Sequence, residues 1–121
     1  MTTEQLKERT KRFAVRIIRL FQELPESRQT QIIGDHLLRS GTSVGAKYAR
    51  VRHARSKADL IQKLGRVIKE AEESAYWLEL LVDMEFANAE TEPLLKEARH
   101  LTAIFNAARS RARKNSGKKR S

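Results

Sequence analysis

Cysteine is absent from the chain, and proline, glycine and aromatic residues are scarce. The absence of cysteine excludes disulfides, thiolate zinc sites, iron–sulfur clusters and cysteine nucleophiles together. With 2 Pro, 5 Gly and 6% aromatic residues in 121, the composition is typical of a helical protein and argues against a β-sandwich. No apolar run approaches the ~20 residues of a membrane helix, and the N-terminus lacks the apolar core of a signal peptide. We therefore expect one helical domain located in the cytoplasm.

Positive charge is the most informative feature that the chain does have. Lys and Arg number 25 against 15 Asp and Glu, and the formal net charge of +10 suggests an anionic partner, most commonly nucleic acid. Residues 109–121 carry seven basic residues and residues 36–58 carry six, with no acid in either segment. Residues 70–97 instead hold nine carboxylates and one basic residue. A merely solvated face is the alternative explanation of the middle cluster.

Four helices are predicted from the spacing of apolar residues. The first begins near Thr2, whose spacing to the glutamine three residues later fits a capping box, and it ends at Pro25. The second spans about residues 27–53, where Gly41 and Gly45 leave one stripe without side chains, so another backbone can approach closely. A weak or kinked helix is the alternative at these positions, because each glycine costs about 1 kcal/mol relative to alanine.

The third predicted helix has the most regular pattern. Ser56 and Asp59 form an N-terminal capping signature. Apolar residues then alternate three and four positions apart for three heptads, which indicates a bundle helix of about 30 residues. The predicted seam consists of Ile61, Leu64, Ile68, Ala71, Ala75, Leu78 and Val82, flanked by Leu60, Val67, Ser74 and Leu81.

The fourth predicted helix starts after residues 88–91 and tolerates Pro93 in its first turn. Beyond residue 108 the chain has nothing apolar to bury, so residues 109–121 are expected to form a basic, disordered tail. Short connections make consecutive helices antiparallel neighbours. The fold class expected for residues 1–108 is therefore all-α, an antiparallel up-down-up-down four-helix bundle.

The last turns of the third helix are apolar on nearly every side. Tyr76, Trp77, Leu80 and Met84 lie away from the predicted seam. A helix that is apolar all round is buried all round, which a small bundle does not achieve by itself. Because aromatic anchors concentrate at interfaces, we predict that these four residues form a homo-oligomer interface. The alternative is that the first helix or the connections cover this face within the monomer.

Patterns for catalysis and metal binding are weak. Glu97 and His100 have the Glu-x-x-His spacing of di-iron bundles, but the motif occurs once, and a surface pair one turn apart is the commoner interpretation. No glycine-rich loop follows a strand, and no nucleophile motif surrounds a serine. We therefore expect a protein that is not an enzyme and that needs no cofactor or metal.

Adjoining stretches of the chain carry a family resemblance. They read LRSGTSVGAKY over residues 38–48, ARSKADLIQKL over 54–64 and KEAEESAYWLELL over 69–81. The chain resembles, over roughly residues 10–108, the four-helix-bundle family of proteins encoded in intervening sequences of bacterial 23S ribosomal RNA genes. The resemblance implies an antiparallel bundle without catalytic activity, often assembled as a ring-shaped pentamer. That family is similar to the accessory protein of diversity-generating retroelements, a basic pentamer that binds nucleic acid and a reverse transcriptase.

The second helix departs from the family pattern at two places. Lys47 stands where the family tends to have asparagine, and Arg50 or Val51 stands where it tends to have an acid. If the family residues pair inside the assembly, that pairing is changed here. Both departures make the helix more basic, which favours anion binding.

These observations predict a non-catalytic, nucleic-acid-binding homo-oligomer, with structured RNA as the favoured ligand. The alternative is an adaptor that docks a partner enzyme such as a reverse transcriptase, and a third possibility is a structural bundle with a solubilising tail. Because few aromatic residues are available for stacking, we expect charge-driven binding with little sequence specificity. The basic residues expected to neutralise phosphates are Arg39, Lys47, Arg50, Arg52, Arg55, Lys57, Arg109, Arg111, Arg113, Lys114, Lys118, Lys119 and Arg120.

Overall fold

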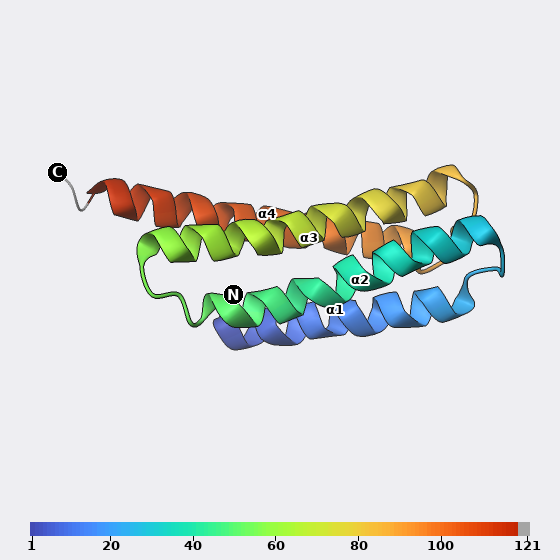
Figure 1. Cartoon of the computed structure of the whole chain (residues 1–121), viewed down its shortest axis with the longest axis horizontal. Helices are drawn as coiled ribbons and strands as arrows, with labels where there is room; N and C mark the ends of the chain where they lie inside the picture. Colours follow the sequence, from blue (N-terminus) through green and yellow to red (C-terminus); the bar gives the residue numbers. More distant parts are fainter. Residues whose placement is uncertain (119–121) are drawn as a thin grey trace.

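Four α-helices make up the computed structural model, which describes residues 1–118, with side chains through residue 115. The helices are α1 (Thr3–Glu23), α2 (Arg28–Val51), α3 (Lys57–Asp83) and α4 (Thr91–Lys118). Connections of four to seven residues join them, so each helix runs antiparallel to the next and packs on it. Figure 1 shows this up-down-up-down arrangement, which confirms the predicted all-α four-helix bundle. None of these helices is long and apolar enough to cross a membrane.

The helix boundaries follow the capping and proline signals in the sequence. The Thr2 side chain accepts a hydrogen bond from the Gln5 N–H at 3.1 Å, and the Gln5 side chain accepts from the Thr2 N–H at 2.9 Å, which confirms the capping box. Ser56 caps α3 by accepting from the Asp59 N–H at 3.1 Å. The residue before Pro25 is extended, as proline requires, and α1 has ended one residue earlier.

Glycines on α2 let α1 approach closely. A Cβ on Gly41 would lie 2.8 Å from Ile17 Cγ1, and a Cβ on Gly45 would lie 3.2 Å from Thr10 Oγ1. Distances this short leave little or no room for a side chain. The predicted close approach is therefore confirmed, and α2 continues through both glycines as one helix.

The core extends along the whole bundle, and α3 contributes to it over a wide face. Val67 and Leu81, predicted to flank the α3 seam, are fully buried, whereas Ile61 and Val82 of the predicted seam are half-buried. The reason is that α3 packs against both α2 and α4, so its buried face is wider than one seam. The largest fully buried side chains include Phe13, Ile17, Leu20, Leu37, Leu78, Leu81, Leu94, Leu101 and Phe105.

The C-terminal helix is longer than the sequence analysis predicted. α4 continues past residue 108 to Lys118, so the expectation of a disordered tail is wrong for this stretch. Ala112 is buried and Arg109 is half-buried, so the extension still contacts the bundle through small and amphipathic side chains. Alanine and arginine also have high helix propensity. Residues 119–121 lie outside the described part of the chain, and the prediction stays untested there.

Candidate nucleic-acid interface

The two ends of the bundle carry opposite charge. The α2–α3 turn and the C-terminus of α4 lie at one end, and the other two connections lie at the opposite end (Figure 1). Residues 40–69 and 104–115 lead to the first end and carry twelve Lys or Arg against one acid, and residues 1–12 add four basic residues and two acids there. Residues 70–103 lead to the opposite end and carry nine acids against two basic residues, and residues 13–39 add three acids and four basic residues there. The fold thus joins two separate basic segments into one surface, which we call the basic end.

The α2–α3 turn is fixed by its one acid, Asp59. Its carboxylate accepts a hydrogen bond from the Arg55 N–H at 3.0 Å and pairs with Lys63 Nζ at 2.6 Å. The hydrogen bond from Lys63, and then that from the Arg55 N–H, hold the pKa of Asp59 below its ordinary value. The acid is therefore ionised and already neutralised by Lys63 at neutral pH. Its charge does little to offset the arginines around it.

A cleft of about 450 Å³ opens beside this turn. We call it the turn cleft; it is lined by Arg50, His53, Arg55, Asp59 and Lys63. Among the described side chains, no carboxylate lies within ion-pair distance of Arg50 or Arg55, and both residues are exposed. Because Asp59 and Lys63 cancel, the cleft presents two uncompensated guanidinium groups. Such groups bind phosphate through paired hydrogen bonds.

A second cleft, of about 500 Å³, adjoins the turn on the side of α1. Lys7, Tyr48, Arg52 and His53 contribute to its lining. Arg52 lies 3.5 Å from Glu4, but both side chains are largely exposed, so the pair is weak and easily exchanged for another anion. Arg52 therefore adds to the charge of the basic end.

The remaining predicted basic residues occupy different surroundings. Arg39 is exposed at the middle of α2, and Lys57 is half-buried in the first turn of α3. Arg109 donates a hydrogen bond to Asn106 Oδ1 at 3.0 Å and lies along α4. Exposed positions on the α4 extension belong to Arg111, Arg113 and Lys114. The Lys118 side chain and residues Lys119 and Arg120 lie outside what the structure describes.

Comparison with known proteins places this bundle in a family. A family model described as 23S rRNA-intervening sequence protein matches residues 3–107. The chain belongs to that family. A crystal structure of a protein of unknown function from the S23 ribosomal protein family of Bacteroides thetaiotaomicron is 33% identical, with a TM-score of 0.81. The match covers 91% of this chain and 99% of that chain. A search of curated proteins finds no match.

In this member of the 23S rRNA-intervening sequence protein family, Lys47 is engaged inside the chain. Its Nζ lies 2.8 Å from Glu70 Oε2, and Glu70 is 9% exposed. Lys47 thus neutralises a buried acid between α2 and α3. Arg50 adds charge to the turn cleft, whereas Lys47 neutralises an acid inside the bundle.

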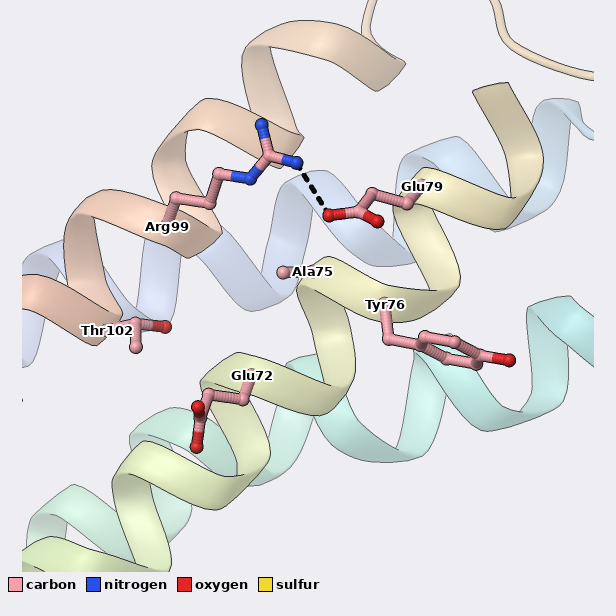
Figure 2. Close-up of a pocket in the computed structure, with 6 residues that line it drawn as sticks. All are labelled: Glu72, Ala75, Tyr76, Glu79, Arg99 and Thr102. Atoms are coloured by element: carbon pink, nitrogen blue, oxygen red, sulfur yellow. Dashed lines mark hydrogen bonds and ion pairs between the residues drawn. The ribbon is translucent and has the colours of Figure 1, made fainter. Parts of the chain in front are cut away.

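The residues predicted to form an oligomer interface fall into two groups. Tyr76 is 54% exposed and Met84 is 48% exposed, whereas Trp77 and Leu80 are half-buried and pack against the core. Trp77 stacks on His36 of α2, with ring centroids 4.4 Å apart and planes 9° from parallel. The apolar face is thus partly covered within the chain, by α2 rather than by α1 or a connection. Figure 2 shows the Tyr76 ring directed away from α4.

The single Glu-x-x-His motif joins α4 to α1. Arg9 donates to both carboxylate oxygens of Glu97 at 2.7 Å, and its Nη2 lies 2.7 Å from His100 Nδ1. Because arginine can only donate, that nitrogen of His100 accepts. The hydrogen bonds from Arg9 hold the pKa of Glu97 below its ordinary value. A guanidinium group thus already faces both residues, and we name this contact the Arg9 clasp.

Sequence analysis missed three residues that the structure adds to these surfaces. His53 lines both clefts, Lys63 neutralises Asp59, and His36 covers Trp77. The four-residue spacing of Asp59 and Lys63 on one helix signals their pairing in advance. The positions of the two histidines depend on how helices pack, which no local spacing reveals.

Proposed function

We propose that the protein is a non-catalytic RNA-binding protein of the cytoplasm whose basic end holds the phosphates of the RNA. The turn cleft carries this proposal, because Arg50 and Arg55 stand exposed beside an acid that Lys63 already neutralises. Exposed Arg111 and Arg113 on the α4 extension enlarge the same end. Neutralising phosphates with these groups releases condensed counterions, which drives binding.

RNA is the polyanion that we propose, because the family is described in terms of 23S rRNA intervening sequences. The basic end offers charged groups from several helices and the α2–α3 turn, arranged around two clefts, rather than from one helix that enters a groove. Contacts of this kind recognise the backbone and the shape of a folded RNA. The expected binding is therefore tight at low salt and weakly dependent on sequence.

A titration of a labelled RNA hairpin at several salt concentrations tests this function. If four to six phosphates are contacted, the logarithm of the binding constant falls with the logarithm of salt with a slope of about −3 to −5. A slope near zero, or no binding at low salt, would contradict the proposal.

Paired variants locate the interface. Replacing Arg50 and Arg55 together by alanine is expected to weaken binding at least tenfold and to reduce the salt slope by about 2, or one unit for each phosphate contact. The control replaces Arg19 and Arg28, which are exposed arginines outside the basic end, and makes the same change in net charge. Equal weakening by both pairs would show that net charge, and not the turn cleft, governs binding.

Self-association is the second part of the proposal. The family resemblance suggests a pentamer, and Met84, which is 48% exposed, leaves apolar surface for contact between copies. Several copies on one RNA would multiply weak contacts. Sedimentation at micromolar concentration tests it, and a single species of 13.9 kDa would contradict it.

The α4 extension separates RNA binding from an adaptor function. Replacing Arg111, Arg113 and Lys114 by glutamine keeps the length of the extension and removes three charges. We expect the RNA affinity of this variant to fall by tenfold or more. An adaptor that docks a protein such as a reverse transcriptase through its bundle would also bind RNA less tightly, but its binding of that protein would be unchanged. The affinity for the protein partner is therefore the readout that separates the two functions.

A further inference from the structure

A shallow groove of about 660 Å³ lies on the α2–α3 face, away from the turn cleft. At its centre is a set of three rings. Trp77 stacks flat on His36, and Tyr76 meets Trp77 edge-on, with centroids 5.0 Å apart and planes at 77°. Half-buried Trp77 packs against the core and anchors the set, while more than half of the Tyr76 side chain remains exposed. We call His36, Trp77 and Tyr76 the aromatic platform, in which Tyr76 is more exposed to solvent than Trp77.

The charges around the groove limit what can bind there. Arg39 and Lys69 contribute positive charge, and Glu72 and Glu73 contribute negative charge. The acids oppose a bare anion such as free phosphate, and the two basic residues oppose a simple cation. A ligand that fits has a flat, uncharged part for the Tyr76 ring and an attached negative group for Arg39 or Lys69. A nucleotide within an RNA strand has this chemistry.

The platform also lies on the path from the turn cleft. Lys63 in the cleft and Tyr76 in the platform are both on α3, 13 residues apart, which corresponds to about 20 Å along the helix axis. Both grooves lie on the face that α3 shares with α2, because Arg50 lines one and His36 lines the other. A few nucleotides of single strand can span this distance.

We infer that Tyr76 stacks on an unpaired base of the RNA whose phosphates the basic end holds. The inference rests on the proposed function and gives it a second site, specific for single-stranded nucleotides. The Arg39 and Lys69 side chains then contact the phosphate next to that base, while His36 and Trp77 keep the Tyr76 ring in place. Tyr76 is one of the few exposed aromatic residues that the sequence analysis expected.

A contact between copies of the chain is the competing use of Tyr76. The ring is surrounded by four charged side chains, and charged residues are depleted at the centres of protein interfaces. Met84, the other exposed apolar residue of the predicted interface, lies eight residues further along and does not line this groove. The observations therefore favour a base over a second copy at this site.

Two RNA probes test the inference. One is an unstructured 12-nucleotide strand and the other is the 12-base-pair duplex of the same sequence. Tyr76→Ala is expected to weaken binding of the single strand about tenfold, as loss of one stacked base does, and to change duplex binding by less than about twofold. Tyr76→Phe keeps the ring and is expected to bind as the unchanged protein does. Ile32→Ala, at a similarly exposed position on α2 outside the groove, is the control.

The fluorescence of Trp77 gives an independent readout, because it is the one tryptophan in the chain. Base stacking on the adjacent Tyr76 is expected to change this emission with the single strand and not with the duplex. Unchanged single-strand affinity of Tyr76→Ala, equal losses for both probes, or a new sedimentation coefficient for this variant would each overturn the inference while leaving the turn cleft intact. Absence of binding by the unchanged protein would overturn both proposals.

Discussion

The α2–α3 seam and the α1–α4 seam close the same bundle by different means. Between α2 and α3, apolar side chains surround a buried hydrogen bond from Ser74 Oγ to Ser40 Oγ at 3.0 Å and the Lys47–Glu70 pair. Between α1 and α4 the contact is smaller, and the Arg9 clasp is its main polar link. The Ser40–Ser74 hydrogen bond of the α2–α3 contact is fully buried, whereas the Arg9 clasp of the α1–α4 contact is partly exposed.

This difference shows how the molecule is built. α2, α3 and α4 form a firm body, and α1 attaches chiefly to α2 through the close approach at the glycines. Both grooves assigned to RNA lie on the firm α2–α3 face. The loss of unfolding free energy on breaking a contact should therefore depend on which pair of helices the contact joins and on how deeply it is buried. The following changes test this dependence, in order of decreasing effect.

The largest effect is expected from Gly41→Val, which fills the close approach of α1 to α2. A Cβ there would meet Ile17 at 2.8 Å, and Ile17 is fully buried. Overpacking of this kind lowers the free energy of unfolding by about 3 kcal/mol. Urea denaturation measures it. Gly65→Ala is the control, because its Cβ would have 3.6 Å to the nearest atom, and it should stabilise α3 by up to about 1 kcal/mol. A tolerated valine at position 41 would contradict the tight α1–α2 contact.

Lys47→Ala is expected to come second, because it leaves the Glu70 carboxylate buried without a partner. Breaking a fully buried pair costs about 3–5 kcal/mol, and the partial exposure of Lys47 reduces the expected loss to about 2 kcal/mol. Adding Glu70→Gln removes the unpaired charge and should restore most of the stability. The RNA affinity of the double variant should match that of the unchanged protein. A large loss of affinity instead would show that Lys47 contacts phosphate.

Arg9→Ala is expected to lower the free energy of unfolding by about 1 kcal/mol, because the Arg9 clasp is only partly buried. The folded pKa of Glu97 is depressed, so the pair stabilises fully above the unfolded value near 4.5 and is lost as pH falls through the lower folded value. The unchanged protein should thus lose stability below about pH 4.5 more steeply than Arg9→Ala does. If the curves of unfolding free energy against pH were parallel for the unchanged protein and Arg9→Ala, the Arg9 clasp would not contribute to stability.

Glu79→Gln is expected to have the smallest effect. Its partner Arg99 lies 2.6 Å away across the α3–α4 groove (Figure 2), but both side chains are about half exposed. Such pairs contribute little, so the change in unfolding free energy should stay below about 0.5 kcal/mol. A loss as large as that of Lys47→Ala would mean that burial does not determine how much each ion pair contributes to the free energy of unfolding.

Much of the fold could be predicted because its signals are local. Thr2 and Ser56 mark helix starts through hydrogen bonds to residues three positions away, and Pro25 marks an end through its own ring. Gly41 and Gly45 indicate close packing because a position without a side chain lets a neighbouring helix approach, whichever helix that is. These features need no knowledge of the rest of the structure.

The candidate site was less predictable because its properties arise between helices. Lys47 and Arg50 look alike in the sequence, yet one faces buried Glu70 and the other faces water. Trp77 looked available for a partner because the covering His36 comes from another helix. The α4 extension was missed because small residues such as Ala112 give a weak hydrophobic signal even where they pack.

The opposite charges at the ends of the bundle give the molecule a permanent electric moment along its long axis, across about 40 Å of helix. A polyanion therefore exerts a torque on the molecule before they touch and turns the α2–α3 turn towards itself. Encounters then begin in a productive orientation. Added salt shortens the range of this torque to about 8 Å at physiological ionic strength. Raising the salt concentration is therefore expected to lower the association rate constant more than it changes the dissociation rate constant.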